Sequence, residues 1–156
     1  MIRVNIPGMG NLELENLVLD FNGTIAVDGR LLPGVEERIK RLADKIKVYV
    51  LTADTYGTAR KVCAGLNVKF YVLKENMGAL EKERFVSRLG AEKTVAVGNG
   101  FNDNRMVKKA ALGIAVLEGE GAASRTVVSA DIIVRDIKEA LDLLLNPRGI
   151  IATLRR

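Results

Sequence analysis

The amino-acid sequence predicts an α/β fold: a doubly wound three-layer sandwich with a mostly parallel sheet. Short runs of β-branched and aliphatic residues alternate with longer amphipathic stretches, which is the pattern of repeated strand–helix–strand units. The apolar runs are nearly continuous, as in strands that are covered on both faces. The chain has 156 residues, close to the usual size of one domain. We therefore expect a single domain over residues 1–156.

The N-terminal part of the chain contains the least regular elements. Residues 1–15 predict a short strand or two, and residues 17–19 predict a buried strand. An Asp-Gly pair at positions 28–29 separates two short apolar runs, at 25–27 and 31–32. This arrangement is typical of a tight β-hairpin. We expect the hairpin to form a small flap after the first buried strand.

Helices and strands alternate along the rest of the chain. Residues 34–46 carry Val35, Ile39, Leu42 and Ile46 at three- and four-residue spacing, as on one face of an amphipathic helix. The further helical patterns cover 55–65, 78–89, 103–110 and 136–145, and the further strand candidates cover 48–51, 70–73, 94–97, 112–116 and 132–134. Right-handed crossovers between parallel strands place the helices on both faces of the sheet.

The composition excludes several kinds of chemistry. The chain has no histidine, which removes Ser-His-Asp and Cys-His nucleophiles and histidine zinc sites. Its one cysteine, Cys63, can form neither an internal disulfide nor a cysteine metal cluster. Any catalysis has to use carboxylates, amides, hydroxyls, lysine, arginine and a metal that is held by oxygen.

Charge and hydropathy indicate the setting. The formal net charge is +5, but basic and acidic residues are mixed along the chain, and there is no Trp beside four Phe and three Tyr. Without an aromatic stacking platform, a nucleic-acid partner is not expected. No apolar run reaches the length of a signal peptide or of a membrane span of about 20 residues. We expect a cytoplasmic protein that has no membrane partner.

Polar residues follow three of the predicted strands. Asp20 ends the first, Thr52 ends the second, and Gly98-Asn99-Gly100 leads to Asp103 after the fourth. Ligands of open parallel sheets bind at this carboxyl edge. Gly23 and Gly100 would allow backbone N–H groups to form an anion-binding nest. Carboxylates beside bound phosphate require a cation, and Mg²⁺ suits this oxygen-rich set. Taken singly, each residue is also compatible with an ordinary turn or helix cap.

These segments resemble a known superfamily. Leu19-Asp20-Phe21-Asn22-Gly23-Thr24, Leu51-Thr52-Ala53-Asp54 and Val97-Gly98-Asn99-Gly100-Phe101-Asn102-Asp103 are similar to the motifs of the haloacid dehalogenase-like (HAD) phosphotransferases. Within that superfamily, residues 16–145 look most like the phosphorylation domain of P-type ATPases. Thr58-Ala59 and the segments 113–116 and 130–134 also resemble pump sequences. The resemblance implies a HAD-like Rossmannoid fold.

The resemblance also implies roles for individual residues. Asp20 would be the nucleophile that forms an aspartyl-phosphate. Lys82 would neutralise the phosphoryl charge, with Lys74 as the second choice for this lysine. The residues that would bind phosphate are Asn22, Gly23, Thr24, Thr52, Ala53 and Lys82. The residues that would hold Mg²⁺ are Asp20, Asn22 (through its carbonyl), Asn99 and Asp103.

The chain departs from the family pattern at two positions. Asn22 occupies the position of the aspartate that protonates the leaving group and activates water, and a carboxamide cannot transfer protons in this way. Asn99 replaces a metal-binding aspartate. We therefore expect a slow Mg²⁺-dependent phosphohydrolase or phosphotransferase. The alternative is a low-turnover phosphate- or nucleotide-sensing module, or a regulatory partner, that uses the same pocket.

The spacing of the motifs leaves no room for a cap domain. Thr52 follows Asp20 by 32 positions, and Asn99 follows Thr52 by 47; the predicted flap, helices and strand fill both intervals. Members of the family that act on small metabolites often carry a cap. An open cleft suits a phosphorylated macromolecule as substrate, or a second copy of the chain that closes the site in a homodimer.

Overall fold

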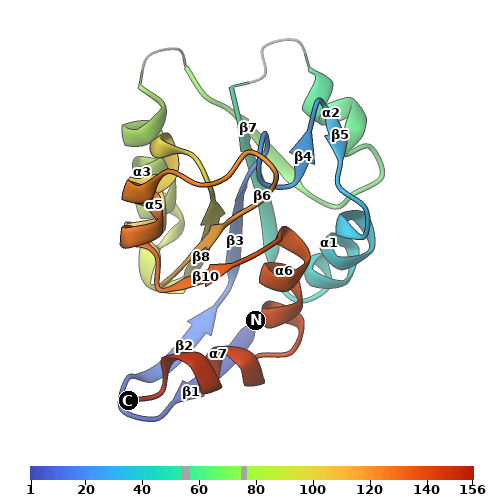
Figure 1. The fold of residues 1–156 in the computed structure, drawn as a ribbon. Coiled ribbons are helices and arrows are strands. Elements are labelled where there is room, and N and C mark those ends of the chain that lie inside the picture. Colours follow the sequence, from blue (N-terminus) through green and yellow to red (C-terminus); the bar gives the residue numbers. More distant parts are fainter. Residues whose placement is uncertain (54–56, 75–76) are drawn as a thin grey trace.

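The computed structural model describes residues 1–53, 57–74 and 77–156. Its centre is a six-stranded, fully parallel sheet in the order β10-β9-β8-β3-β6-β7 (Figure 1). The strands are β3 (Asn16–Asp20), β6 (Lys47–Thr52), β7 (Lys69–Val72), β8 (Thr94–Gly98), β9 (Leu112–Val116) and β10 (Ile132–Val134). All six predicted strands are present, although the edge strand β7 is only partly buried.

Helices cover both faces of the sheet, so the predicted doubly wound three-layer sandwich is confirmed (Figure 1). In β3, Leu17 and Leu19 point to one hydrophobic core, and Val18 points to the other. The first core includes residues of α1 (Val35–Ala43), α2 (Thr58–Val62) and α6 (Ile137–Leu145). The second includes residues of α3 (Gly78–Leu89) and α4 (Asn104–Lys109), against which α5 (Ser124–Ser129) packs.

The helices differ from the sequence prediction mainly at their ends. Helix α1 ends at Ala43, short of the predicted residue 46. The start of the helix predicted over 55–65 lies outside the described residues, and α2 ends at Val62. Short 3₁₀ turns, η1 (Ala91–Lys93) and η2 (Phe101–Asp103), precede β8 and α4. The pattern did not predict α5 or α7 (Arg148–Leu154), because six or seven residues offer too few turns for a clear apolar periodicity.

Two small hairpins flank the main sheet. Strands β1 (Ile2–Ile6) and β2 (Gly10–Leu14) form an antiparallel pair at the amino-terminal end, and α7 packs against β1 (Figure 1). Strands β4 (Ala26–Val27) and β5 (Arg30–Leu31) form the predicted flap. Its turn residues Asp28 and Gly29 both have positive φ, 49° and 71°, as a type I′ hairpin turn requires. No helix of the described residues combines the length and apolar character that crossing a membrane requires.

Candidate active site

The carboxyl edge of the sheet forms a small polar pocket. Because β3, β6 and β8 are parallel neighbours, their last residues and the loops after them meet at one edge. The pocket has a volume of about 190 Å³. Its lining consists of Asp20, Asn22, Thr52, Ala53, Leu73, Lys82, Asn99, Gly100, Asn102 and Glu120. Six of the residues predicted for the site therefore surround one cavity.

A buried lysine joins the two predicted carboxylates. The Nζ atom of Lys82 lies 2.6 Å from Oδ1 of Asp20 and 2.6 Å from Oδ1 of Asp103. The Lys82 side chain is 1% exposed, that of Asp103 is fully buried, and that of Asp20 is 13% exposed. Phe85 and Val86, which belong to the buried face of α3, follow Lys82 by three and four positions, respectively. The same helix face therefore directs Lys82 inward.

This cluster contains more negative than positive charge. Burial raises the pKa of Asp20 to about 7, and the nearby charge of Asp103 adds to the rise, while Lys82 and the Thr24 hydroxyl oppose it. Burial disfavours the charged form of Lys82, yet the charges of Asp20 and Asp103 raise the pKa of its ammonium group. Lys82 therefore stays positively charged at neutral pH, whereas Asp20 changes between its protonated and ionised forms near neutral pH.

The Asp103 carboxylate is held by the turn after β8. Its Oδ2 atom accepts hydrogen bonds from the N–H of Asn99 (3.0 Å) and of Gly100 (2.9 Å). A Cβ atom at position 98 would lie 2.5 Å from Cγ of Asp103, so the close approach requires Gly98. The prediction that Gly100 offers its N–H to a bound anion needs correction, because the side chain of Asp103 already takes that place.

The turn after β3 also differs from the prediction. Gly23 has a φ of 76°, but its N–H donates to the Ala26 carbonyl at 2.8 Å and so does not form a nest for phosphate. Thr24 is fully buried, and its N–H donates to the Phe21 carbonyl at 3.3 Å. The Thr24 hydroxyl lies 3.2 Å from Oδ2 of Asp20 and 3.3 Å from the Asn99 side-chain oxygen. Thr24 thus contacts the predicted nucleophile instead of the pocket.

The other predicted residues occupy distinct places. Asn22 is exposed at the edge of the pocket, and Thr52 is buried in its wall. Lys74, the second choice for the motif lysine, is exposed, and its backbone N–H donates to Glu81. Asp54 of the second motif lies outside the described residues.

The sequence did not single out Leu73, Asn102 or Glu120, which also line the pocket. Glu120 belongs to the loop after β9, the neighbour of β8 in the sheet. Its carboxylate approaches the position that a Cβ at residue 23 would take, so Gly23 provides the space for it. Ligands of open parallel sheets bind at the carboxyl ends of the strands. Examining the residues after β9 in the same way would have identified Glu120 from the sequence.

The oxygen atoms of the pocket fit a hard divalent cation. Asp20 and Asp103 already share one positive centre, the ammonium group of Lys82. The described residues contain no group of three Asp, Glu, His or Cys side chains that could hold a metal. The two carboxylates would therefore need the oxygens of Asn22 and Asn99, or water, to complete the shell. Such a mixture of a few carboxylates with neutral oxygen ligands is typical of Mg²⁺.

Comparison with known proteins shows the family of the chain. Residues 5–111 match the family model of haloacid dehalogenase-like hydrolases. A soluble P-type ATPase-like phosphatase of Methanocaldococcus jannaschii is 30% identical over 77% of the chain and 45% of its own length. A probable copper-exporting P-type ATPase of Archaeoglobus fulgidus is 34% identical over 78% of the chain and 15% of its own length. The chain thus spans less than half of these two relatives.

A solved structure shows the same fold. The 3-deoxy-D-manno-octulosonate 8-phosphate phosphatase of Moraxella catarrhalis superposes with a TM-score of 0.72 at 13% identity, over 89% of this chain and 90% of that one. The segment matched by the family model contains Asp20, Thr52 and Lys82, which line the pocket, and Asp103, which pairs with Lys82. The chain belongs to the haloacid dehalogenase-like hydrolase family.

Proposed function

We propose that the chain is a Mg²⁺-dependent phosphohydrolase or phosphotransferase that acts through an aspartyl-phosphate on Asp20. The observation that carries the proposal is the buried cluster of Asp20, Lys82 and Asp103 at the strand ends. Phosphoryl transfer depends mainly on positioning and on neutralisation of charge. A carboxylate that faces a polar pocket beside a permanently charged lysine meets both needs.

The chemistry of Asp20 follows from its surroundings. An oxygen of Asp20 attacks the phosphorus atom, a bond between that oxygen and phosphorus forms, and the bond to the leaving oxygen breaks with its electron pair. Thr24 and Lys82 hold the carboxylate in place, while Thr52 and Ala53 line the side of the pocket where the phosphoryl oxygens would lie. Water then attacks phosphorus and releases the Asp20 carboxylate.

Mg²⁺ would be held by Asp20, Asp103 and the oxygens of Asn22 and Asn99. When bound, it supplies positive charge to the phosphoryl oxygens. The Moraxella phosphatase was crystallised with magnesium and phosphate ions, which supports this choice of cofactor.

Turnover should be slow because Asn22 cannot transfer protons. General acid–base catalysis contributes roughly 10²–10⁴-fold, and the described residues lining the pocket include no histidine. Good leaving groups, such as acyl phosphates and aryl phosphates, need no protonation and should be the best substrates. The two asparagines also favour an alternative, a low-turnover phosphate- or nucleotide-sensing module that uses the same pocket.

One experiment separates these two functions. The protein is incubated with acetyl phosphate and Mg²⁺, and the wild type is compared with Asp20→Asn. The proposal expects Mg²⁺-dependent release of phosphate and an acid-stable phosphoprotein, both lost in the variant. Binding of phosphate without a phosphoprotein would favour the sensing module. Equal phosphoprotein signals from both proteins would exclude Asp20 as the nucleophile.

A further inference from the structure

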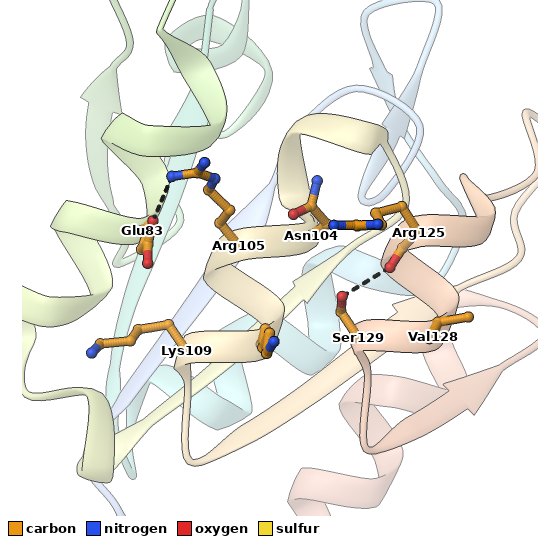
Figure 2. A pocket seen from close by; sticks show the side chains of 8 residues that line it. Glu83, Asn104, Arg105, Lys109, Arg125, Val128 and Ser129 are labelled. Carbon is orange, nitrogen blue, oxygen red and sulfur yellow. Dashed lines mark hydrogen bonds and ion pairs between the residues drawn. The ribbon is translucent and has the colours of Figure 1, made fainter.

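A basic groove lies between α3, α4 and α5, outside the catalytic pocket. It has a volume of about 630 Å³. Its wall consists of Glu83, Asn104, Arg105, Lys108, Lys109, Arg125, Val128 and Ser129. In Figure 2, Glu83 stands on one wall of the groove, Arg105 and Lys109 project from the helix in the middle, and Arg125 projects from the helix on the other side.

The charges in this groove are not balanced. It contains four cations and one carboxylate, and that carboxylate, Glu83, already pairs with Arg105 at 3.3 Å. Lys108, Lys109 and Arg125 are exposed, and they form no ion pair with the residues that the structure describes. Three unpaired cations in one concave surface create a local positive potential that attracts anionic ligands.

A second hollow adjoins the groove and includes Phe101, whose two neighbours in the chain line the catalytic pocket. It has a volume of about 440 Å³ and shares Asn104, Arg105 and Arg125 with the groove. It is also lined by Phe101 and Met77, whose side chains are 67% and 50% exposed. Phe101 lies in the chain between Gly100 and Asn102, which line the catalytic pocket. A substrate whose phosphate reaches Asp20 would therefore pass Phe101 on its way to the groove.

We propose that this groove binds the acidic segment beside the phosphorylated residue of a protein substrate. The inference rests on the proposed function and assigns its substrate class. The lining of the groove and of the second hollow combines cations with exposed apolar side chains, namely Phe101, Met77 and Val128. This combination favours a peptide over a nucleic acid. The exposed apolar side chains suit the apolar side chains of a peptide. A single strand of nucleic acid would need several aromatic rings on which to stack its bases, and Phe101 alone is present among the residues that line the two hollows.

The test compares two phosphotyrosyl peptides of equal length. In one, phosphotyrosine is followed by glutamates, and in the other by lysines; acetyl phosphate is the small reference substrate. The groove variant carries Lys108→Ala, Lys109→Ala and Arg125→Ala. The control carries Arg41→Ala, Lys45→Ala and Lys47→Ala, exposed cations at or before the start of β6, at the opposite edge of the sheet. It changes the net charge by the same amount.

The wild type should prefer the acidic peptide in kcat/KM. The groove variant should lose about tenfold of this preference, as expected for three exposed charge pairs, while it keeps its turnover of acetyl phosphate. The control variant should behave like the wild type. Equal kcat/KM values for both peptides in the wild type would overturn the proposal. So would a tighter binding of a 5′-phosphorylated oligonucleotide, which would assign the groove to nucleic acid.

Failure of the proposed function can be recognised separately. If the wild type does not turn over acetyl phosphate, the affinity of both labelled peptides is measured by fluorescence anisotropy. If the wild type and the control variant bind the acidic peptide selectively and the groove variant does not, the result supports the groove as a peptide-binding site even without catalysis. The absence of selective binding refutes it. Circular dichroism melting curves establish that all variants are folded.

Discussion

Replacement of Asp20, the proposed nucleophile, should make the protein more stable at neutral and alkaline pH. The pKa of Asp20 is about 7 in the folded chain and 3.8 in ordinary surroundings. The folded state therefore binds the proton more tightly than the unfolded state between these two values. Each pKa unit corresponds to about 1.4 kcal/mol, so the free energy of unfolding should fall by about 4 kcal/mol as the pH rises through this window. The stabilisation is complete below pH 3.8 and is lost above about pH 7.

Asp20→Asn tests this reasoning because asparagine has the shape of a protonated aspartate and never ionises. The variant and the wild type should be about equally stable near pH 4. At pH 8 the variant should be more stable by about 4 kcal/mol. Urea unfolding is followed by circular dichroism across this range in the presence of a chelator. Parallel pH profiles, or a variant less stable than the wild type at pH 8, would refute the electrostatic argument.

Three further changes probe other parts of the pocket. Asn22→Asp should shorten the lifetime of the proposed phosphoenzyme by about tenfold or more, since it introduces a carboxylate that can transfer protons. A pulse–chase of labelled phosphoprotein measures this lifetime, and an unchanged lifetime would contradict the prediction. Glu120→Gln removes a negative charge from the proposed phosphate pocket and should strengthen the binding of inorganic phosphate by about twofold to fivefold, as measured by calorimetry. Slower turnover at unchanged phosphate affinity would instead assign Glu120 to proton transfer. Gly98→Ala places a Cβ 2.5 Å from Cγ of Asp103 and should lower the free energy of unfolding by about 1–3 kcal/mol; a chemical denaturation curve equal to that of the wild type would show that the turn can shift.

The regular part of the fold could be predicted from the sequence because burial on both faces leaves a simple signature. Each strand of the main sheet has a nearly continuous apolar run. Because parallel strands end at the same edge of the sheet, the residues that follow these runs, Asp20, Thr52 and Asp103, could be predicted to lie close together. The phase of α3 distinguishes Lys82 from Lys74. Lys82 shares a face with buried Phe85, whereas Lys74 is exposed after β7.

The hydrogen bonds of the turns could not be predicted in the same way. Both glycine turns were expected to offer N–H groups to a ligand, but Gly23 bonds to the Ala26 carbonyl and Gly100 bonds to the Asp103 carboxylate. Glycine spacing indicates that a turn can form. It does not indicate which acceptor within the protein binds the N–H groups of the turn, because that acceptor can come from a residue that only the three-dimensional structure places beside the turn. Glu120 reaches the pocket through a loop whose position depends on the order of the strands.

The charges in and beside the pocket support the proposed role of a cation. Asp20, Asp103 and Glu120 contribute three negative charges when they are ionised, and Lys82 contributes one positive charge. A phosphoryl dianion would double the resulting excess of two negative charges in a mostly buried site, where charge repulsion is weakly screened. A divalent cation that Asp20 and Asp103 help to hold would offset that excess, and its charge would favour the ionised form of Asp20. The raised pKa of Asp20 and the proposed need for Mg²⁺ then have one cause: the pocket concentrates negative charge that Lys82 alone cannot neutralise.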